Sequence, residues 1–274
     1  MKRFVIPLGM LLSLAGCASQ QASVKPEATA ARAQVESTLS VFSSNPVGGL
    51  PQGWEPMILL RNKKQTLYEL VTKDNATVLH ARADSASSGL MHKVDINAEQ
   101  QPWLHWSWQI TSLVNSADNT KRATEDSPVR VILGFDGDKD TMPFTDQVLF
   151  ETARVMTGYE FPYATLMYIW ENNKPTGTVI GSTYTSRIKM MVAESGSDGI
   201  GEWRNFARNI VEDFEKAYGE KPGRLIGVGV LTDTDNTGES AEAWYGDIQL
   251  LRERFAHHAG PGAAQPSLSL SQRK

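Results

Sequence analysis

The densest group of potential ligand oxygens in the sequence is the segment from Asp233 to Glu239, DTDNTGE. Ca²⁺ binds several carboxylate and carbonyl oxygens in a loop, so Asp233, Asp235 and Asn236 are candidate ligand-binding residues and the two aspartates are candidate metal ligands. An EF-hand is excluded, because Trp244 stands where that loop requires a bidentate glutamate. A tight turn, in which the Asp and Asn side chains bind their own backbone, is the alternative interpretation.

Two arginines are also candidates for ligand binding. Arg130 lies opposite the apolar face of a predicted strand, and Arg187 lies beside Ile188 and Met190. A buried or half-buried arginine needs a carboxylate partner. Such a pair can recognise an acidic or hydroxyl-rich ligand through two parallel hydrogen bonds, and a purely structural salt bridge is the alternative. The available carboxylates are Asp126, which is itself a candidate ligand-binding residue, Asp136, Asp233 and Asp235.

Aromatic side chains on two predicted strands could form a surface for a sugar, because sugar rings stack on flat aromatic faces. Tryptophans at alternating strand positions also commonly fill the core of a sandwich, and this is the competing interpretation. The residues concerned are Trp106, Trp108, Tyr168 and Trp170.

Catalysis has little support in the sequence. The motifs HExxH, GxSxG and the P-loop do not occur. Cys17 is the only cysteine, so the chain after it has no thiol nucleophile, disulfide or thiolate metal site. Pairs of carboxylates for glycoside hydrolysis are possible, but no spacing selects one. The formal net charge of −4 argues against nucleic acid as a partner.

Short segments with two-residue alternation must position these side chains. In the segment 104–110, apolar residues alternate with His105, Ser107 and Gln109, as in a strand with one heavy apolar face. Asp74-Asn75 is a turn signal between two such segments and predicts a hairpin. The predicted strands are 66–71, 77–83, 104–110, 129–135, 166–170, 187–193, 225–231 and 243–250.

A single helix is predicted over residues 203–218, where apolar residues recur every three or four positions. Gly219 is placed to end it, and Pro222 prevents its continuation. Many strands with one helix do not form a βαβ series. The predicted fold is therefore mainly β, an antiparallel β-sandwich of jelly-roll type.

The first residues are typical of a lipoprotein export signal. Lys2 and Arg3 precede an apolar run from Phe4 to Leu14 that is too short to span a bilayer. The run ends in Leu-Ala-Gly-Cys17, which resembles the bacterial lipobox and implies lipidation of Cys17; an ordinary signal peptide with a chance cysteine is the alternative. Ala18 resembles an outer-membrane address, so we expect anchoring at the periplasmic face of the outer membrane.

Composition sets the expected boundaries of the folded part. Residues 18–48 are rich in Ala, Ser, Gln and Glu and predict a flexible tether. The predicted organisation is a signal peptide over 1–16, a lipidated tether over 17–48, a β-sandwich domain over 49–255 and a disordered tail over 256–274, with a possible structural Ca²⁺ as the only cofactor.

Several separate motifs resemble a known family. They are LHWSW at 104–108, TDTDNTG at 232–238 and AWYGDI at 243–248. Together they are similar to the bacterial domain of unknown function 3047 over roughly residues 53–251, and the segment 137–161 fits less well and reads as an insertion. The family has no settled activity, so the resemblance implies a fold and a periplasmic setting without naming a reaction.

A weaker likeness concerns the closing strand, which resembles the last strand of jelly-roll carbohydrate-binding modules. In those modules an aspartate at this place often helps to hold Ca²⁺, which makes Asp247 a candidate metal ligand by analogy. The leading hypothesis is a lipid-anchored protein that binds a saccharide or another envelope component. A carbohydrate-active hydrolase or lyase, and an assembly lipoprotein that binds an envelope protein, are the alternatives.

Overall fold

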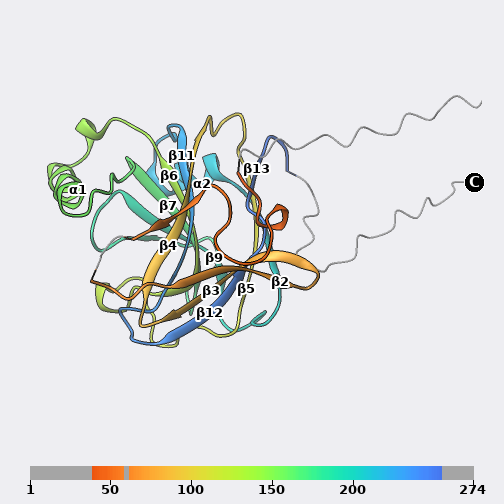
Figure 1. Ribbon diagram of the computed structural model, residues 1–274. Helices are drawn as coiled ribbons and strands as arrows, with labels where there is room; N and C mark the ends of the chain where they lie inside the picture. The colour runs from red at the N-terminus through yellow and green to blue at the C-terminus, as the bar shows by residue number, and fades with distance from the viewer. Residues whose placement is uncertain (1–38, 59–61, 255–274) are drawn as a thin grey trace, which may run out of the picture. The chain divides into compact units, whose positions relative to one another are not determined.

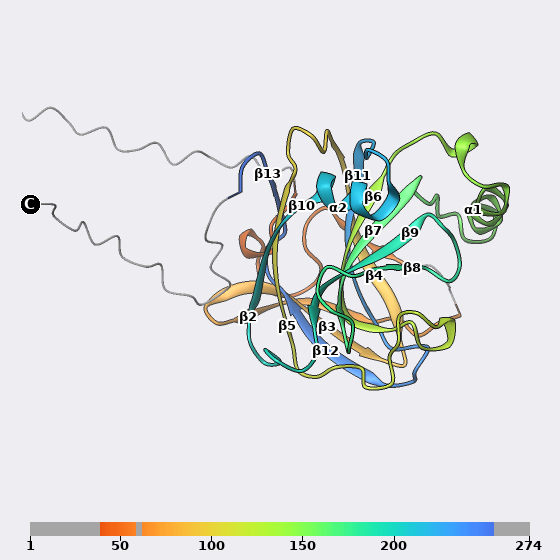
Figure 2. The same cartoon turned by 180° about the vertical axis from the view of Figure 1, so that it is seen from behind.

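Two β-sheets face each other in the computed structural model, which describes residues 39–58 and 62–254 (Figures 1 and 2). The seven-stranded sheet contains, in spatial order, β1 (Trp54–Met57), β4 (Ser87–Ile96), β11 (Leu225–Asp233), β6 (Ser127–Phe135), β7 (Ala164–Glu171), β9 (Ile188–Ser195) and β8 (Val179–Gly181). The six-stranded sheet contains β10 (Arg204–Asn209), β5 (Trp103–Ile110), β12 (Ser240–Tyr245), β3 (Ala76–Asp84) and β2 (Leu67–Lys73), with β13 (Gln249–Leu251) pairing β5.

The strand order is that of a jelly roll. Eight strands taken in chain order, β3, β4, β5, β6, β7, β10, β11 and β12, are shared between the sheets. The first, eighth, third and sixth lie side by side in one sheet, and the second, seventh, fourth and fifth lie side by side in the other. Two interleaved Greek keys give this order. The prediction of an antiparallel sandwich of jelly-roll type is confirmed, with one parallel pair, β7 with β9.

The turn predicted at Asp74-Asn75 forms as expected. Both residues have positive φ, 49° and 62°, which is the conformation of a two-residue hairpin turn that matches strand twist. It joins β2 to β3, whose residues pair from Lys73 with Ala76 to Leu67 with Arg82.

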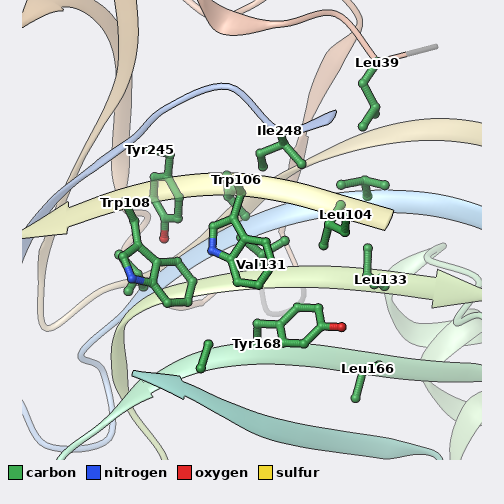
Figure 3. Packing of buried hydrophobic residues seen from close by; sticks show 14 of the residues in the cluster. Leu39, Leu104, Trp106, Trp108, Val131, Leu133, Leu166, Tyr168, Tyr245 and Ile248 are labelled. Carbon is green, nitrogen blue, oxygen red and sulfur yellow. The ribbon is translucent and has the colours of Figure 1, made fainter. Parts of the chain in front are cut away.

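Aromatic side chains fill the space between the sheets. Trp106 and Trp108 project from β5 toward Tyr168 of the opposite sheet (Figure 3). The Trp106 ring stacks on Tyr168 at 4.8 Å and on Phe206 at 4.7 Å, measured between ring centroids. The strands predicted over 104–110 and 166–170 are confirmed as β5 and β7, and the aromatic group lies in the core.

The prediction of one helix over 203–218 is wrong in its first half. Residues 204–209 form the edge strand β10, and only Ile210–Tyr218 is helical, as α2. Asn209 caps the helix by accepting hydrogen bonds from the backbone of Val211 and Glu212, and Gly219 ends it with φ 72°. Phe206 fits a helical period, but its ring packs on Trp106 and Trp108 of the neighbouring strand β5. Tertiary packing therefore overrides the local helical pattern at residues 204–209.

A second helix, α1 (Phe144–Thr157), was not predicted and lies within the segment 137–161 that reads as an insertion. Figures 1 and 2 both place it at the periphery, beyond the edge of the sheets. The short 3-10 helices are η1 (Phe42–Ser44), η2 (Arg122–Thr124) and η3 (Lys139–Thr141).

The folded part begins earlier than predicted. Leu39 and Phe42 are buried in the main core, and the Phe42 ring packs against Trp54 at 5.0 Å. The predicted tether over 17–48 therefore cannot extend to residue 48, because burial of these side chains fixes that part of the chain to the sandwich. The predicted signal peptide, Cys17 and the predicted tail over 256–274 lie outside the described residues. Within those residues, no helix has the length and apolar character needed to cross a membrane.

Candidate functional site

Four of the predicted site residues meet where β6 begins and β11 ends. Asp126 immediately precedes β6, Arg130 lies on β6, and Asp233 ends β11, followed by Asp235 in the next turn. Ligand atoms of the three aspartates lie within 4.8 Å of one another. We call these four residues, together with Lys63 and Glu125, the polar cluster.

Arg130 is the centre of the polar cluster, with only 2% of its surface exposed. Its Nε donates to Oδ1 of Asp233 at 3.0 Å and its Nη2 donates to Oδ2 at 3.3 Å. Nη2 also donates to the side-chain oxygen of Asn119 and to the backbone oxygen of Glu125. Burial raises the pKa of Asp233 to about 6, against the attraction of Arg130. The carboxylate partner expected for Arg130 is therefore Asp233, and the pair is a buried salt bridge, which was the alternative to ligand binding.

Asp126 and Asp235 have structural partners of their own. Asp126 Oδ2 accepts hydrogen bonds from the backbone nitrogen and the hydroxyl of Thr237, both at 2.7 Å. Asp235 pairs with Lys63, Nζ to Oδ2 at 2.6 Å. The segment 233–239 is therefore a turn, with Gly238 at φ 72°. Its Asp233, Asp235 and Asn236 side chains do not bind their own backbone, as the turn interpretation expected, but bind Arg130, Lys63 and the backbone of Glu125.

The polar cluster is poorly suited to Ca²⁺. That ion needs six to eight oxygen ligands, whereas two cationic side chains, Arg130 and Lys63, already contact the carboxylates of Asp233 and Asp235. The third predicted metal ligand, Asp247, does not join them. It follows β12 at the end away from this turn and accepts hydrogen bonds from the backbone nitrogen and hydroxyl of Ser43, at 2.8 and 2.5 Å.

The open side of the polar cluster contains groups that the sequence did not single out. The Glu125 carboxylate accepts a 3.4 Å hydrogen bond from the hydroxyl of Thr183, and burial raises its pKa. Tyr184 is 46% exposed, and the guanidinium of Arg122 lies 4.3 Å from the centre of its ring. Asn236, which is exposed, donates to the backbone oxygen of Glu125. Lys63 and Tyr184 come from loops far from the other cluster residues in the sequence, so no spacing could reveal them. Glu125 directly precedes the candidate Asp126 and could have been named with it.

The tryptophans predicted as a surface for a sugar are buried in the main core. Trp106 and Trp108 have no exposed surface, and Trp170 has 1%. Trp170 also donates its indole N–H to the backbone oxygen of Gly196 at 2.9 Å. Their assignment to ligand binding is wrong, because a sugar can stack only on a ring face that solvent reaches.

Arg187 also lies apart from the polar cluster. Its backbone oxygen pairs with Thr165 at the start of β7, whereas Arg130 pairs with Ile169 near the end of that strand. Its guanidinium binds Glu220 at 2.8 Å and stacks over Tyr163 at 3.9 Å. This is the structural salt bridge that was the alternative interpretation.

A comparison with curated protein sequences gives no match. Among solved structures, the chain is similar to the family 11 carbohydrate-binding module of the cellulosomal cellulase Lic26A-Cel5E of Clostridium thermocellum, with 7% identity, 82% of this chain and 99% of that chain covered, and a TM-score of 0.39. The cellulose induced protein Cip1 is similar at 11% identity, with 77% of this chain and 96% of that chain covered and a TM-score of 0.36. Such identities say nothing of the ligand. The family model of proteins of unknown function DUF3047 matches residues 52–249, and the chain belongs to this family.

Proposed function

We propose that this protein is a lipid-anchored binding protein of the bacterial cell envelope that recognises a saccharide at the open side of the polar cluster. The observation that carries the proposal is an exposed aromatic ring, Tyr184, which follows Thr183, the hydrogen-bond partner of the Glu125 carboxylate, and contacts Arg122. A saccharide needs polar groups beside an aromatic ring, because its hydroxyls require donors and acceptors while its C–H faces pack on the ring.

The groups around Tyr184 offer a mixed set of donors and acceptors. Glu125 supplies a half-buried carboxylate, Lys63 supplies an ammonium group, and Asn236 supplies an exposed amide. Hydrogen bonds to charged groups stabilise by about 1.5–3 kcal/mol each. The ligand would contact these groups and Tyr184, while the buried pair of Arg130 and Asp233 would hold the loops in register.

Binding is better supported than hydrolysis at this place. A glycosidase needs two carboxylates that flank the substrate in an open site. Asp126 and Asp233 are buried, and both already accept hydrogen bonds from the protein. Neither can therefore approach a glycosidic bond without opening the turn.

The ligand proposal is tested with the full chain in detergent, on an array of envelope polysaccharides followed by calorimetry on the best ligand. Tyr184→Ala and Glu125→Gln are each expected to weaken binding about tenfold, because each removes a contact of roughly 1.4 kcal/mol or more. Phe144→Ala, at another exposed aromatic residue, is the matched control and keeps full affinity. Saccharide binding that is unchanged in both cluster variants would refute this site, and the absence of any saccharide ligand would refute the function.

The anchor proposal is supported by the sequence around Cys17 and has its own test. Cys17→Ser is expected to abolish incorporation of labelled palmitate, because it removes the thiol that would accept the acyl groups. Ala18→Asp is the control that keeps the cysteine and the label. Palmitate incorporation that survives Cys17→Ser, or that is absent from the wild type, would contradict a lipid anchor at Cys17.

A further inference from the structure

A hollow lies on the outer face of the seven-stranded sheet, and none of its lining residues belongs to the polar cluster. Its volume is about 280 Å³, and it extends across β4, β11, β6 and β7. One wall is the segment Tyr159–Pro162, which follows α1. Phe161 of this wall stacks on Phe150 of α1 at 5.2 Å, which holds the wall in place. We call this hollow the methionine groove.

Flexible apolar side chains form most of the methionine groove. Met57, Met91 and Met167 line it together with Ile132 and Leu231. Methionine has an unbranched, polarisable side chain that adapts to the shape of an apolar ligand. The lining contrasts with the polar cluster, because hydroxyl-rich ligands would lose hydrogen bonds to water here without replacement.

Two glycines keep the floor of the methionine groove low. A Cβ atom at Gly134 would lie 3.2 Å from the ring of Pro162, and one at Gly227 would lie 3.1 Å from the sulfur of Met91. Both contacts are tighter than ordinary van der Waals contact, so a larger residue would push the wall and the methionine away from the sheet. The space therefore depends on the absence of side chains at these two positions.

The volume of the methionine groove fits a single acyl chain better than a whole lipid. Sites for drug-sized ligands occupy about 300–1,000 Å³, so this volume is too small for a lipid with two acyl chains.

The charges at the mouth of the methionine groove favour an anionic head group. Lys93 and Glu160 both line it. Glu160 is paired with Lys139, Oε1 to Nζ at 2.8 Å, and Lys93 is paired with Glu55 at 3.7 Å. The Lys93–Glu55 pair joins two exposed side chains across a long distance and is therefore weak, so an incoming carboxylate can compete for Lys93. We infer that the methionine groove binds a fatty acid, with one unbranched chain over the glycine floor and its carboxylate at Lys93.

This inference is tested on the full chain with saturated fatty acids from octanoate to palmitate, each below its micellar concentration, by displacement of a fluorescent fatty acid. Affinity is expected to rise about threefold to fourfold with each added methylene, and to stop rising when the groove is full. Met91→Glu is expected to weaken binding at least tenfold, because it places a charge in the apolar lining. Lys93→Gln is expected to weaken binding of the acids while leaving fatty alcohols unchanged.

Matched controls separate the groove from general adsorption and from the polar cluster. Leu67→Glu introduces the same charge at an exposed apolar residue of the other sheet, and Lys221→Gln removes an exposed lysine elsewhere. Both are expected to bind fatty acids as the wild type does, and so is Tyr184→Ala. The inference would be overturned if affinity did not depend on chain length, or if Met91→Glu bound fatty acids as the wild type does. It would also be overturned if an apolar peptide displaced the fluorescent fatty acid and none of the saturated fatty acids did. None of these outcomes would affect the separate proposal that a saccharide binds at the polar cluster.

Discussion

Replacing Arg130 with methionine is expected to lower the free energy of unfolding by about 3–5 kcal/mol, because removal of one member of a buried ion pair leaves the other charge uncompensated. Arg130 is 2% exposed, and it holds Asp233 by two hydrogen bonds. Methionine retains much of the apolar volume beside Met190, so the loss reports the charge rather than a cavity. Denaturant unfolding at pH 8 measures the change.

The pH dependence of this variant gives an independent readout. In the wild type, burial raises the pKa of Asp233 to about 6 although Arg130 lowers it. Without the guanidinium the pKa of Asp233 rises further, so the folded variant must keep this group protonated or bury an unpaired anion. The destabilisation should therefore be smaller at pH 5, where Asp233 is protonated in both folded proteins, and should grow as the pH rises through 6.

The double variant Arg130→Met with Asp233→Leu is the control for the ion pair. Replacing both members of a buried pair by apolar residues is often close to neutral. We expect the double variant to recover a large part of the stability lost in the single variant. A single variant that loses less than about 1 kcal/mol, or a loss that does not change with pH, would show that Arg130 does not compensate a buried charge.

Replacing Trp106 with alanine is expected to cost about 3–5 kcal/mol of unfolding free energy, the range for deletion of a large buried aromatic ring. Trp106 has no exposed surface and packs on Tyr168 and Phe206. These contacts join β5 to the opposite sheet and to the edge strand β10, so the resulting cavity lies between the sheets. Thermal and denaturant unfolding both measure the effect.

Trp106→Phe separates packing from hydrogen bonding at the same position. Within residues 39–58 and 62–254, the indole N–H of Trp106 has no hydrogen-bond partner. Phenylalanine thus removes volume but breaks no polar contact, and we expect it to cost less than half of the alanine effect. If Trp106→Ala lost saccharide binding while keeping its stability, the assignment of this residue to the core would be wrong.

Local pattern predicted β2, β3, β5, β6, β7, β9 and β11 and the hairpin of β2 with β3. It missed β1, β4, β8 and β10, and it merged β12 and β13 into the single segment 243–250. The alternation in 104–110 became β5, and Asp74-Asn75 became the turn between β2 and β3, because side-chain period and turn conformation depend on neighbours in the chain. The same local logic failed at Phe206. Its spacing suits a helix, yet residues 204–209 form β10, because the ring completes a core that exists only after the sheets have packed.

Sequence pattern alone indicated the jelly-roll class, the aromatic core as one of two interpretations, and Arg130, Asp126, Asp233 and Asp235 as residues that could form a site. The convergence of these four residues, and the separate positions of Arg187 and Asp247, come from the packed fold. The packed fold also brings Lys63, Glu125 and Tyr184 to the polar cluster and opens a groove beside glycines of separate strands. Burial and contact between distant loops follow from the crossing of strands between two sheets, which no short stretch of sequence encodes.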